Sequence, residues 1–315
     1  MSNTKNNFSM LILEGFVVNS EVRIILFFSV LAAYLFIVFG NVTLFLVITF
    51  NRNLHAPMYV MLCNMAICDL MGSSAVLPRM ISDFLTEIKM ISYEACFIQA
   101  FCIHFYSAAG HLILTAMAFD RYVAICDPLR YNTIMTNRTL VKLCSMAWGI
   151  SFILILILIA LTLRLPRCRS QIMNPYCSNG NLFVLSCTDT TATTVFAVFV
   201  YNFLTGVSVC AIFWTYTKIL ITCLLKTYSN SKNKAIHTCS THLAVYIVFE
   251  SSPLFSIIAL QFPNITPNII KAMGVLTIII PPSLNPIIYG ISTKEIRDNI
   301  LKYFKKKVVT SRTNW

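Results

Sequence analysis

The chain has 315 residues, of which 57% are hydrophobic and only 11% are charged, and its formal net charge is +12. So little polar surface cannot coat a soluble globule of this size, which excludes an ordinary soluble domain. The composition therefore predicts a membrane protein.

Apolar segments long enough to cross a bilayer recur along the chain. A spanning helix needs roughly 20 residues, because each residue adds about 1.5 Å along the helix axis. Seven such segments are found, near residues 24–50, 57–82, 97–119, 140–161, 193–225, 240–261 and 269–291. The predicted fold class is an all-α bundle of seven transmembrane helices, with the two ends of the chain on opposite sides of the membrane.

The distribution of Lys and Arg predicts the orientation. The first, third and fifth connections and the C-terminal side hold 16 of the 24 basic residues. Cytoplasmic segments are enriched in Lys and Arg, so we expect a cytosolic C-terminus and an outer N-terminus in a multi-pass plasma membrane protein. The net charge then reflects contact with anionic lipid headgroups of the bilayer and not with nucleic acid.

The expected domains follow from these spans. Residues 1–23 form an extracellular N-terminus, residues 24–291 the seven-span domain, and residues 292–315 a cytoplasmic tail. The N-terminus lacks an apolar core with a cleavage site, so we expect no removable signal peptide. Asn7 begins the triplet Asn-Phe-Ser, a glycosylation acceptor on the expected outer side.

Four of the twelve cysteines fall in the expected outer region, where disulfides persist. These are Cys96, Cys168, Cys177 and Cys187, and they allow three pairings. The other eight lie in or beside spans, where cysteine packs as a small apolar residue. No CxxC pair or histidine cluster indicates a metal site.

Asp120-Arg121-Tyr122 stands at the expected cytoplasmic end of the third span. A fixed charge beside a membrane-length helix is costly, so we interpret this tripeptide as a functional switch. The Asp120 carboxylate can neutralise Arg121 at rest, and outward movement of the sixth span would free Arg121 for a partner.

Two further polar groups lie within spans. Asn285, Pro286 and Tyr289 place a helix break near the inner end of the seventh span, where the helix can pivot. Asp69 lies in the middle of the second span, and we expect it to face Asn41, Asn285 and water inside the bundle.

The order and spacing of several motifs identify a resemblance that covers nearly the whole chain. It resembles a rhodopsin-like G-protein-coupled receptor, and specifically a vertebrate odorant receptor. The motifs are Gly40-Asn41, Leu54 to Tyr59, Pro78-Arg79-Met80, Met117 to Cys126, Pro128 to Tyr131, Lys234-Ala235, Thr238 to Leu243, Pro282 to Tyr289, and Thr293 to Arg297.

The resemblance implies disulfides Cys96–Cys177 and Cys168–Cys187, which would hold the long outer loop as a lid over a cavity. It implies no cofactor. Asp69 is interpreted either as part of a static polar network or as an inhibitory sodium site, and in this chain Gly110 replaces the glutamate that in the family often helps to hold that ion. The resemblance also implies a small-molecule odorant as ligand and a heterotrimeric G protein as partner, of the stimulatory olfactory type that raises cyclic AMP. The coupling and switch residues would be Asp120, Arg121, Tyr122, Pro128, Tyr131, Lys234, Asn285, Pro286 and Tyr289.

Residues 293–304 alternate apolar and basic side chains in a pattern typical of a helix lying on the membrane surface. Ile296, Ile300, Leu301 and Phe304 would form its apolar face, and Lys294, Arg297, Lys302 and Lys305 its basic face.

We expect the ligand cavity in the outer half of the bundle, because small-molecule sites form between helices. The candidate wall residues are His104, Ser107, Ala108, His111, Tyr201, Thr205, Phe249, Glu250, Ser252, Met273 and Thr277. Glu250 replaces the tyrosine that is usual in the family, and a membrane-embedded acid indicates a functional site. We hypothesise that Glu250 favours polar or basic odorants, or lies protonated against His104 or Ser252.

Other classes fit less well. A transporter would show internal repeats, and an enzyme would show a nucleophile and base in a recognisable motif. A retinal protein needs a lysine at the depth of Ile279, and an aminergic receptor an aspartate where this chain has Ile103. A receptor for a non-odorant small molecule outside the olfactory epithelium remains the alternative.

Overall fold

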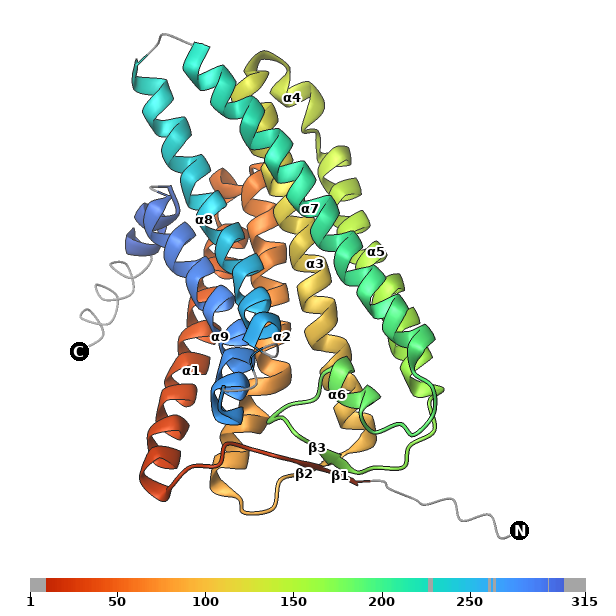
Figure 1. Cartoon of the computed structure of the whole chain (residues 1–315). Helices are drawn as coiled ribbons and strands as arrows, with labels where there is room; N and C mark the ends of the chain where they lie inside the picture. Colours follow the sequence, from red (N-terminus) through yellow and green to blue (C-terminus); the bar gives the residue numbers. More distant parts are fainter. Residues whose placement is uncertain (1–9, 226–228, 260–261, 263–264, 294, 303–315) are drawn as a thin grey trace, which may run out of the picture.

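Seven long helices form the bundle that the sequence predicts (Figure 1). The computed structural model describes residues 10–225, 229–259, 262, 265–293 and 295–302. The long helices are α1 (Ser20–Phe50), α2 (Pro57–Leu85), α3 (Tyr93–Cys126), α5 (Asn137–Leu163), α7 (Thr191–Leu225), α8 (Ser229–Ala259) and α9 (Pro267–Ser292). Each overlaps one predicted span, so the predicted fold class is confirmed.

Six of these helices are long and apolar enough, by length and composition, to cross a membrane within the described part of the chain. The seventh, α8, begins with the polar run Ser229-Asn-Ser-Lys-Asn-Lys, so its mean hydropathy is lower than that of the other six helices. Its apolar part runs on from Leu243 and corresponds to the sixth predicted span.

Helix starts are set by local chemistry. The side chain of Asn19 accepts a hydrogen bond from the Val22 amide at the start of α1, and Ser92 and Thr136 cap α3 and α5 in the same way. These caps satisfy backbone N–H groups that have no partner within the helix. Pro57 and Pro267 each occupy the first position of a helix, where a missing N–H costs nothing.

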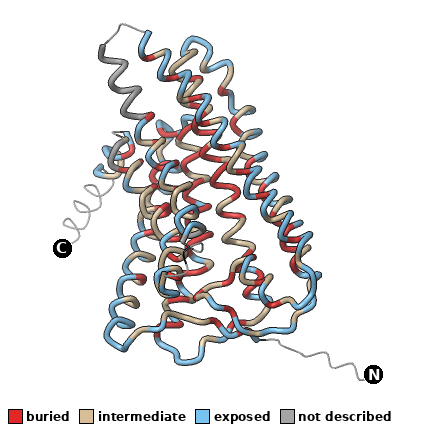
Figure 2. The backbone as a smooth tube through the Cα atoms, viewed as in Figure 1, coloured by how far each residue is buried: buried red, intermediate tan, exposed pale blue. Residues whose placement is uncertain are grey.

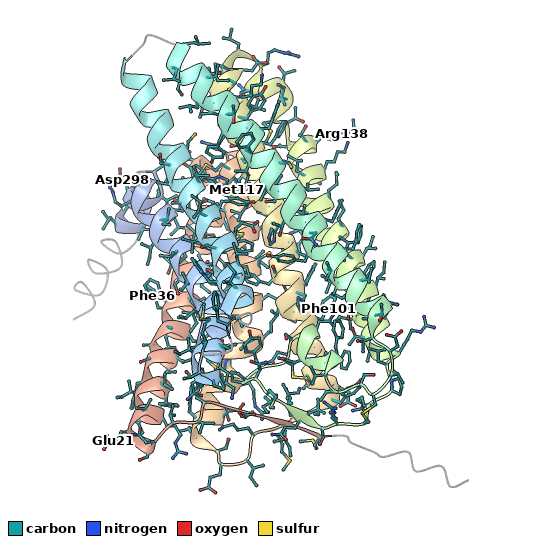
Figure 3. The ribbon with its side chains drawn as sticks, in the orientation of Figure 1. Glu21, Phe36, Phe101, Met117, Arg138 and Asp298 are labelled. Atoms are coloured by element: carbon teal, nitrogen blue, oxygen red, sulfur yellow. A yellow bond between two sulfur atoms is a disulfide. The ribbon has the colours of Figure 1, made fainter. Side chains whose placement is uncertain are left out.

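Helix α3 lies at the centre of the bundle, and nearly all of its residues are buried or half-buried (Figure 2). Met117 points into this interior, whereas Phe36 points outward from α1 (Figure 3). Many large apolar side chains lie exposed on α1, α5 and α7, which is the surface that a bilayer would cover.

A small sheet at one end of the bundle was not predicted. Strand β1 (Met10–Leu13) pairs antiparallel with β2 (Met90–Ser92) and parallel with β3 (Gln171–Ile172). Leu11 and Leu13 point into the bundle, and Met10 and Ile12 are exposed, which is the alternation of a half-buried strand. We call this end of the molecule the sheet end.

The opposite end, which we call the Arg121 end, holds the short helices η1 (Arg52–Leu54), η2 (Pro128–Arg130) and α4 (Tyr131–Ile134). A further helical segment covers residues 295–302. Ile296 is fully buried in the main core and Ile300 packs against that core, while Leu301 is 50% exposed. Lys294, Phe304 and Lys305 of the expected amphipathic helix lie outside the described residues, as does the glycosylation acceptor Asn7.

Candidate functional site

A cavity of about 540 Å³ lies between α3, α7, α8, α9 and the segment that joins α5 to α7. That segment contributes residues 174–181, including part of the short helix α6 (Asn179–Phe183). The wall consists of Ile103, His104, Tyr106, Ser107, Asn174, Tyr176, Ser178, Gly180, Asn181, Tyr201, Phe249, Pro253, Ile270, Gly274, Thr277, Ile278 and Pro281.

Some of the sequence-predicted ligand residues lie on this wall and others do not. His104, Ser107, Tyr201, Phe249 and Thr277 line the cavity. The other predicted residues are not among the described lining residues: Ala108, His111, Thr205, Glu250, Ser252 and Met273. The loop residues between Asn174 and Asn181 were not predicted individually, because no helical periodicity marks them.

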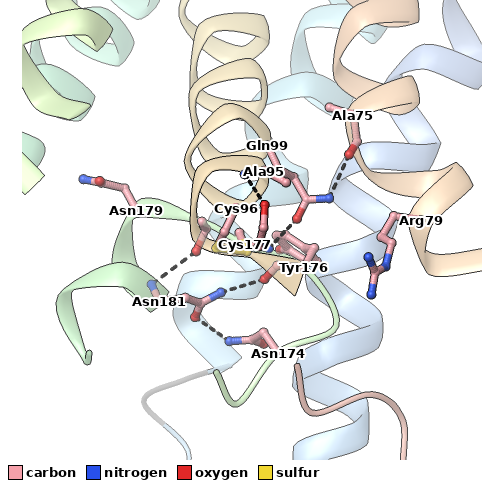
Figure 4. Close-up of a disulfide and its surroundings, with 12 residues drawn as sticks. Ala75, Arg79, Ala95, Cys96, Gln99, Asn174, Tyr176, Cys177, Asn179 and Asn181 are labelled. Atoms are coloured by element: carbon pink, nitrogen blue, oxygen red, sulfur yellow. Dashed lines mark hydrogen bonds between the residues drawn. A yellow bond between two sulfur atoms is a disulfide. The ribbon is translucent and has the colours of Figure 1, made fainter. Parts of the chain in front are cut away.

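Two disulfides hold the α5–α7 segment, and they are the pairs that the resemblance implies. Cys96 at the start of α3 joins Cys177, and Cys168 joins Cys187. Gln99 strengthens the first link, because its side-chain oxygen accepts from the Cys177 amide at 2.7 Å (Figure 4). Its side-chain amide donates to the carbonyl oxygen of Ala75 on α2, also at 2.7 Å. The lid is thereby fixed to two helices.

Tyr176 fits closely against a glycine on α9. A Cβ added at Gly274 would lie 2.6 Å from the Tyr176 hydroxyl oxygen, so only glycine leaves room for this ring. Burial raises the pKa of Tyr176 to about 12, so the phenol stays protonated and is a hydrogen-bond donor. Asn181 braces the same segment by donating to the Tyr176 carbonyl oxygen and accepting from Asn174 (Figure 4).

His104 has a defined orientation on the wall. The Asn179 amide donates to its Nε2 atom at 3.1 Å, so Nε2 is an acceptor and a neutral ring carries its proton on Nδ1. The lid helix α6 therefore sets the tautomer of a histidine that faces the cavity.

Glu250 on α8 meets a histidine of α3, but this histidine is His111 and not His104. Its Oε1 atom lies 3.0 Å from Nε2 of His111 on α3. Glu250 also lies close enough to the cavity-lining Tyr201 and to Tyr246 for its charge to act on both phenols. Glu250 thus links α8 to α3.

Asp120 and Arg121 are paired at the Arg121 end. Asp120 Oδ2 accepts from Arg121 Nη2 at 2.5 Å, and Oδ1 accepts from the Tyr131 hydroxyl at 2.8 Å. Burial raises the pKa of the Tyr131 phenol, and the Asp120 carboxylate raises it further. The arrangement satisfies both oxygens of a fully buried carboxylate and holds the guanidinium close to α3.

Tyr122 and Pro128, two further predicted switch residues, follow this pair in the chain. Tyr122 packs its ring 4.9 Å from that of Trp214, and the exposed Pro128 opens η2. The Tyr216 hydroxyl lies 2.6 Å from Nδ1 of buried His242, a link between α7 and α8 that was not predicted. Lys234 lies in α8, but its side chain is outside the described residues.

Asp69 meets Asn285 as expected but not Asn41. The Asn285 amide donates to Asp69 Oδ2 at 2.7 Å, while both hydrogen bonds of the Asn41 amide go to carbonyl oxygens, of Ile37 and Pro282. Tyr289, one turn after Asn285, is 1% exposed. The Oδ1 atoms of Asn41, Asp69 and Asn285 are among the buried oxygens that have no hydrogen-bond partner in the described part of the chain.

Comparison with known proteins identifies the family. The profile of the olfactory receptor family matches residues 29–307. Human olfactory receptor 4F4 is 35% identical over 91% of this chain and 93% of its own length. Mouse olfactory receptor 4B13 is 33% identical over 96% of this chain and 98% of its own length. The chain therefore belongs to the olfactory receptor family of rhodopsin-like G-protein-coupled receptors, which are multi-pass plasma membrane receptors and not enzymes.

Proposed function

We propose that this chain binds a small odorant in the cavity at the sheet end and activates a heterotrimeric G protein of the stimulatory olfactory type, raising cyclic AMP. One observation carries the proposal: a single helix, α3, places His104 and Ser107 on the cavity wall and Arg121 at its other end. A ligand that shifts α3 or its neighbours can therefore act on the coupling surface.

The proposed orientation puts the sheet end outside the cell and the Arg121 end in the cytosol. Both disulfides lie in the segments at the sheet end, and disulfides persist in oxidising surroundings. The excess of Lys and Arg in the connections at the other end supports the same orientation.

The lining chemistry indicates the ligand class. The described wall contains no Asp, Glu, Lys or Arg, and most of its surface comes from apolar and aromatic side chains. Tyr176, His104 and Ser107 offer hydrogen-bond donors to a ligand. A neutral molecule with an oxygen acceptor, such as an aldehyde, ketone or alcohol, suits this wall better than an amine, which would stay charged without a counter-ion.

Coupling would use the cytosolic face around Arg121. The Arg121 side chain is 19% exposed, and the Pro128–Arg130 turn that follows in the chain is exposed. A G protein that competes with Asp120 for Arg121 would release α8 from this face. Pro128, Tyr131 and Lys234 would complete the contact surface.

We also propose a sodium ion near Asp69 as an inhibitory effector. The unpartnered oxygens of Asn41, Asp69 and Asn285 fit a hard cation, since such ions take oxygen ligands. The ion would supply positive charge to a buried carboxylate. Gly110 offers no ligand of its own, and its space is filled by the Phe249 ring, which would lie 2.6 Å from an added Cβ.

The test is a cyclic AMP assay in cells that carry the olfactory stimulatory G protein, with a panel of aldehydes, ketones, alcohols, amines and carboxylic acids. Surface expression is measured in parallel, and Arg121→Ala provides the signalling control. A response to neutral odorants that Arg121→Ala abolishes would support the proposal. Silence across the panel at normal surface expression would contradict it and favour a non-odorant ligand, which tissue expression would then help to identify.

A further inference from the structure

The contact between His111 on α3 and Glu250 on α8 is buried between the two helices. The atoms Nε2 and Oε1 are 3.0 Å apart, an ion-pair distance at an angle that does not make a hydrogen bond, and the side chains are 4% and 16% exposed. A carboxyl group so far from water needs a partner, because an unpaired charge inside a helix bundle is costly.

The other ring nitrogen determines where the protons lie. His111 Nδ1 is 2.6 Å from the carbonyl oxygen of Ser107, one turn earlier on the same helix. A carbonyl oxygen only accepts, so Nδ1 carries a hydrogen. In a neutral ring Nε2 would then present a lone pair, and it would repel the lone pairs of a carboxylate oxygen at 3.0 Å.

We infer that His111 and Glu250 share one proton and that this contact is a latch that holds α8 against α3. The proton belongs either to an imidazolium beside a carboxylate or to a carboxylic acid beside a neutral imidazole. Both forms have zero net charge, whereas loss of the proton would leave a net negative charge in the apolar interior.

The latch lies directly beneath the cavity. Phe249, the residue before Glu250, lines the cavity and packs its ring 5.0 Å from that of His111. The same ring rests on Gly110, the residue before His111, where a side chain would clash. A ligand that displaces Phe249 must therefore disturb the shared proton, so the pair connects ligand binding to movement of α8.

This inference rests on the proposed function for its meaning, but the latch itself can be tested without ligand or G protein. Spin labels at Arg130→Cys and Ser240→Cys, both exposed positions near the Arg121 end, report the distance between η2 and α8. Native exposed cysteines are replaced by serine in this background. The ligand-independent cyclic AMP signal is measured on the same variants and normalised to surface expression.

Glu250→Leu removes the acceptor and should shift receptors toward a longer distance, with about a 5-fold or larger rise in the open population, the lower end of usual coupling between sites. Glu250→Gln should behave like the parent, because its amide N–H can donate to the Nε2 lone pair of a neutral His111. Ser251→Ala is the matched control on α8, since among the described residues the Ser251 hydroxyl donates to the Val248 carbonyl oxygen of its own helix.

Glu250→Leu could fold poorly because it leaves a buried imidazole nitrogen unpaired. The double variant His111→Leu with Glu250→Leu replaces both polar partners by apolar side chains. These side chains can pack together, but they cannot form the latch. We expect this variant to reach the surface and to show the same long distance.

An unchanged distance in the double variant would overturn the latch, and so would a Glu250→Gln variant that opens as far as Glu250→Leu. A longer distance with no cyclic AMP in any variant would support the latch and contradict the proposed G-protein type. The two failures are therefore distinguishable.

Discussion

Asn41 on α1 donates a hydrogen bond at 3.0 Å to the carbonyl oxygen of Pro282 on α9. That carbonyl would normally accept from the N–H of residue 286, but Pro286 has none. The side chain of one helix thus replaces the backbone hydrogen bond that a proline removes from another. Pro286 also packs on Gly40, where an added Cβ would lie 2.8 Å from its ring.

Asn41→Ala should therefore lower the free energy of unfolding by about 1–3 kcal/mol, because it leaves the Pro282 carbonyl oxygen buried and unpaired. Thermal unfolding of the purified receptor in detergent measures the effect. The Pro286→Ala background supplies an N–H for this carbonyl, so Asn41→Ala should cost less there. If Asn41→Ala lowered the free energy of unfolding equally in the two backgrounds, the Asn41 side chain would not be replacing the backbone hydrogen bond of the Pro282 carbonyl.

Gly274→Ala should reduce ligand potency about 10-fold, equivalent to about 1.4 kcal/mol, because the new methyl group would push Tyr176 out of the lid. Dose–response curves for the best odorant measure the shift. Tyr176→Phe in the Gly274→Ala background removes the oxygen that lies 2.6 Å from the added Cβ and should restore part of the potency, because the clash is relieved while a donor to the ligand is lost. Gly206→Ala is the matched control, since an added Cβ there has no neighbour within 4 Å. If Gly206→Ala reduced ligand potency as much as Gly274→Ala does, the steric explanation would be wrong.

The two disulfides should differ in their contribution to stability. They link residues 81 and 19 positions apart, and the chain-entropy relation gives about 4.5 and about 3.3 kcal/mol for such loops. Replacing both Cys96 and Cys177 by serine should therefore lower surface expression and melting temperature more than replacing Cys168 and Cys187. A larger effect from the second pair would show that loop closure is not the main contribution.

Glu14 and Lys271 form a link between the N-terminal segment and α9 that is sensitive to loss of one partner. Lys271 is 3% exposed and donates to Glu14 at 2.8 Å and to the Gly15 carbonyl oxygen at 3.1 Å. Glu14→Gln should destabilise the receptor, since it leaves a buried ammonium without its counter-ion. The double variant with Lys271→Met should recover much of the melting temperature. If the melting temperature of the double variant did not recover, the Glu14 and Lys271 side chains would contribute to stability independently.

Sodium should lower agonist affinity, and Asp69→Asn should abolish that effect, because the amide carries no charge to hold a cation. Radioligand or fluorescence binding of the best odorant, in sodium chloride against choline chloride at equal ionic strength, measures it. The same dependence on sodium in both proteins would place the ion elsewhere or exclude it.

The sequence alone determined the seven-helix bundle, because membrane spans require long apolar runs that local composition reveals. It also placed Asp120, Arg121 and Asn285 correctly within their helices, since motif position along a helix is a local property. The β1 strand could not be predicted from the sequence, because its four residues are paired with β2 and β3, which lie far away along the chain.

Only the tertiary structure decided which side chains meet. Helical spacing put His104 and His111 on one face of α3, yet His104 faces the lid and His111 faces Glu250. The choice depends on the rotation and tilt of α8 against α3, which the packing of Phe249 on Gly110 sets. Such close approach depends on the fit of two surfaces at once, so neither helix encodes it by itself.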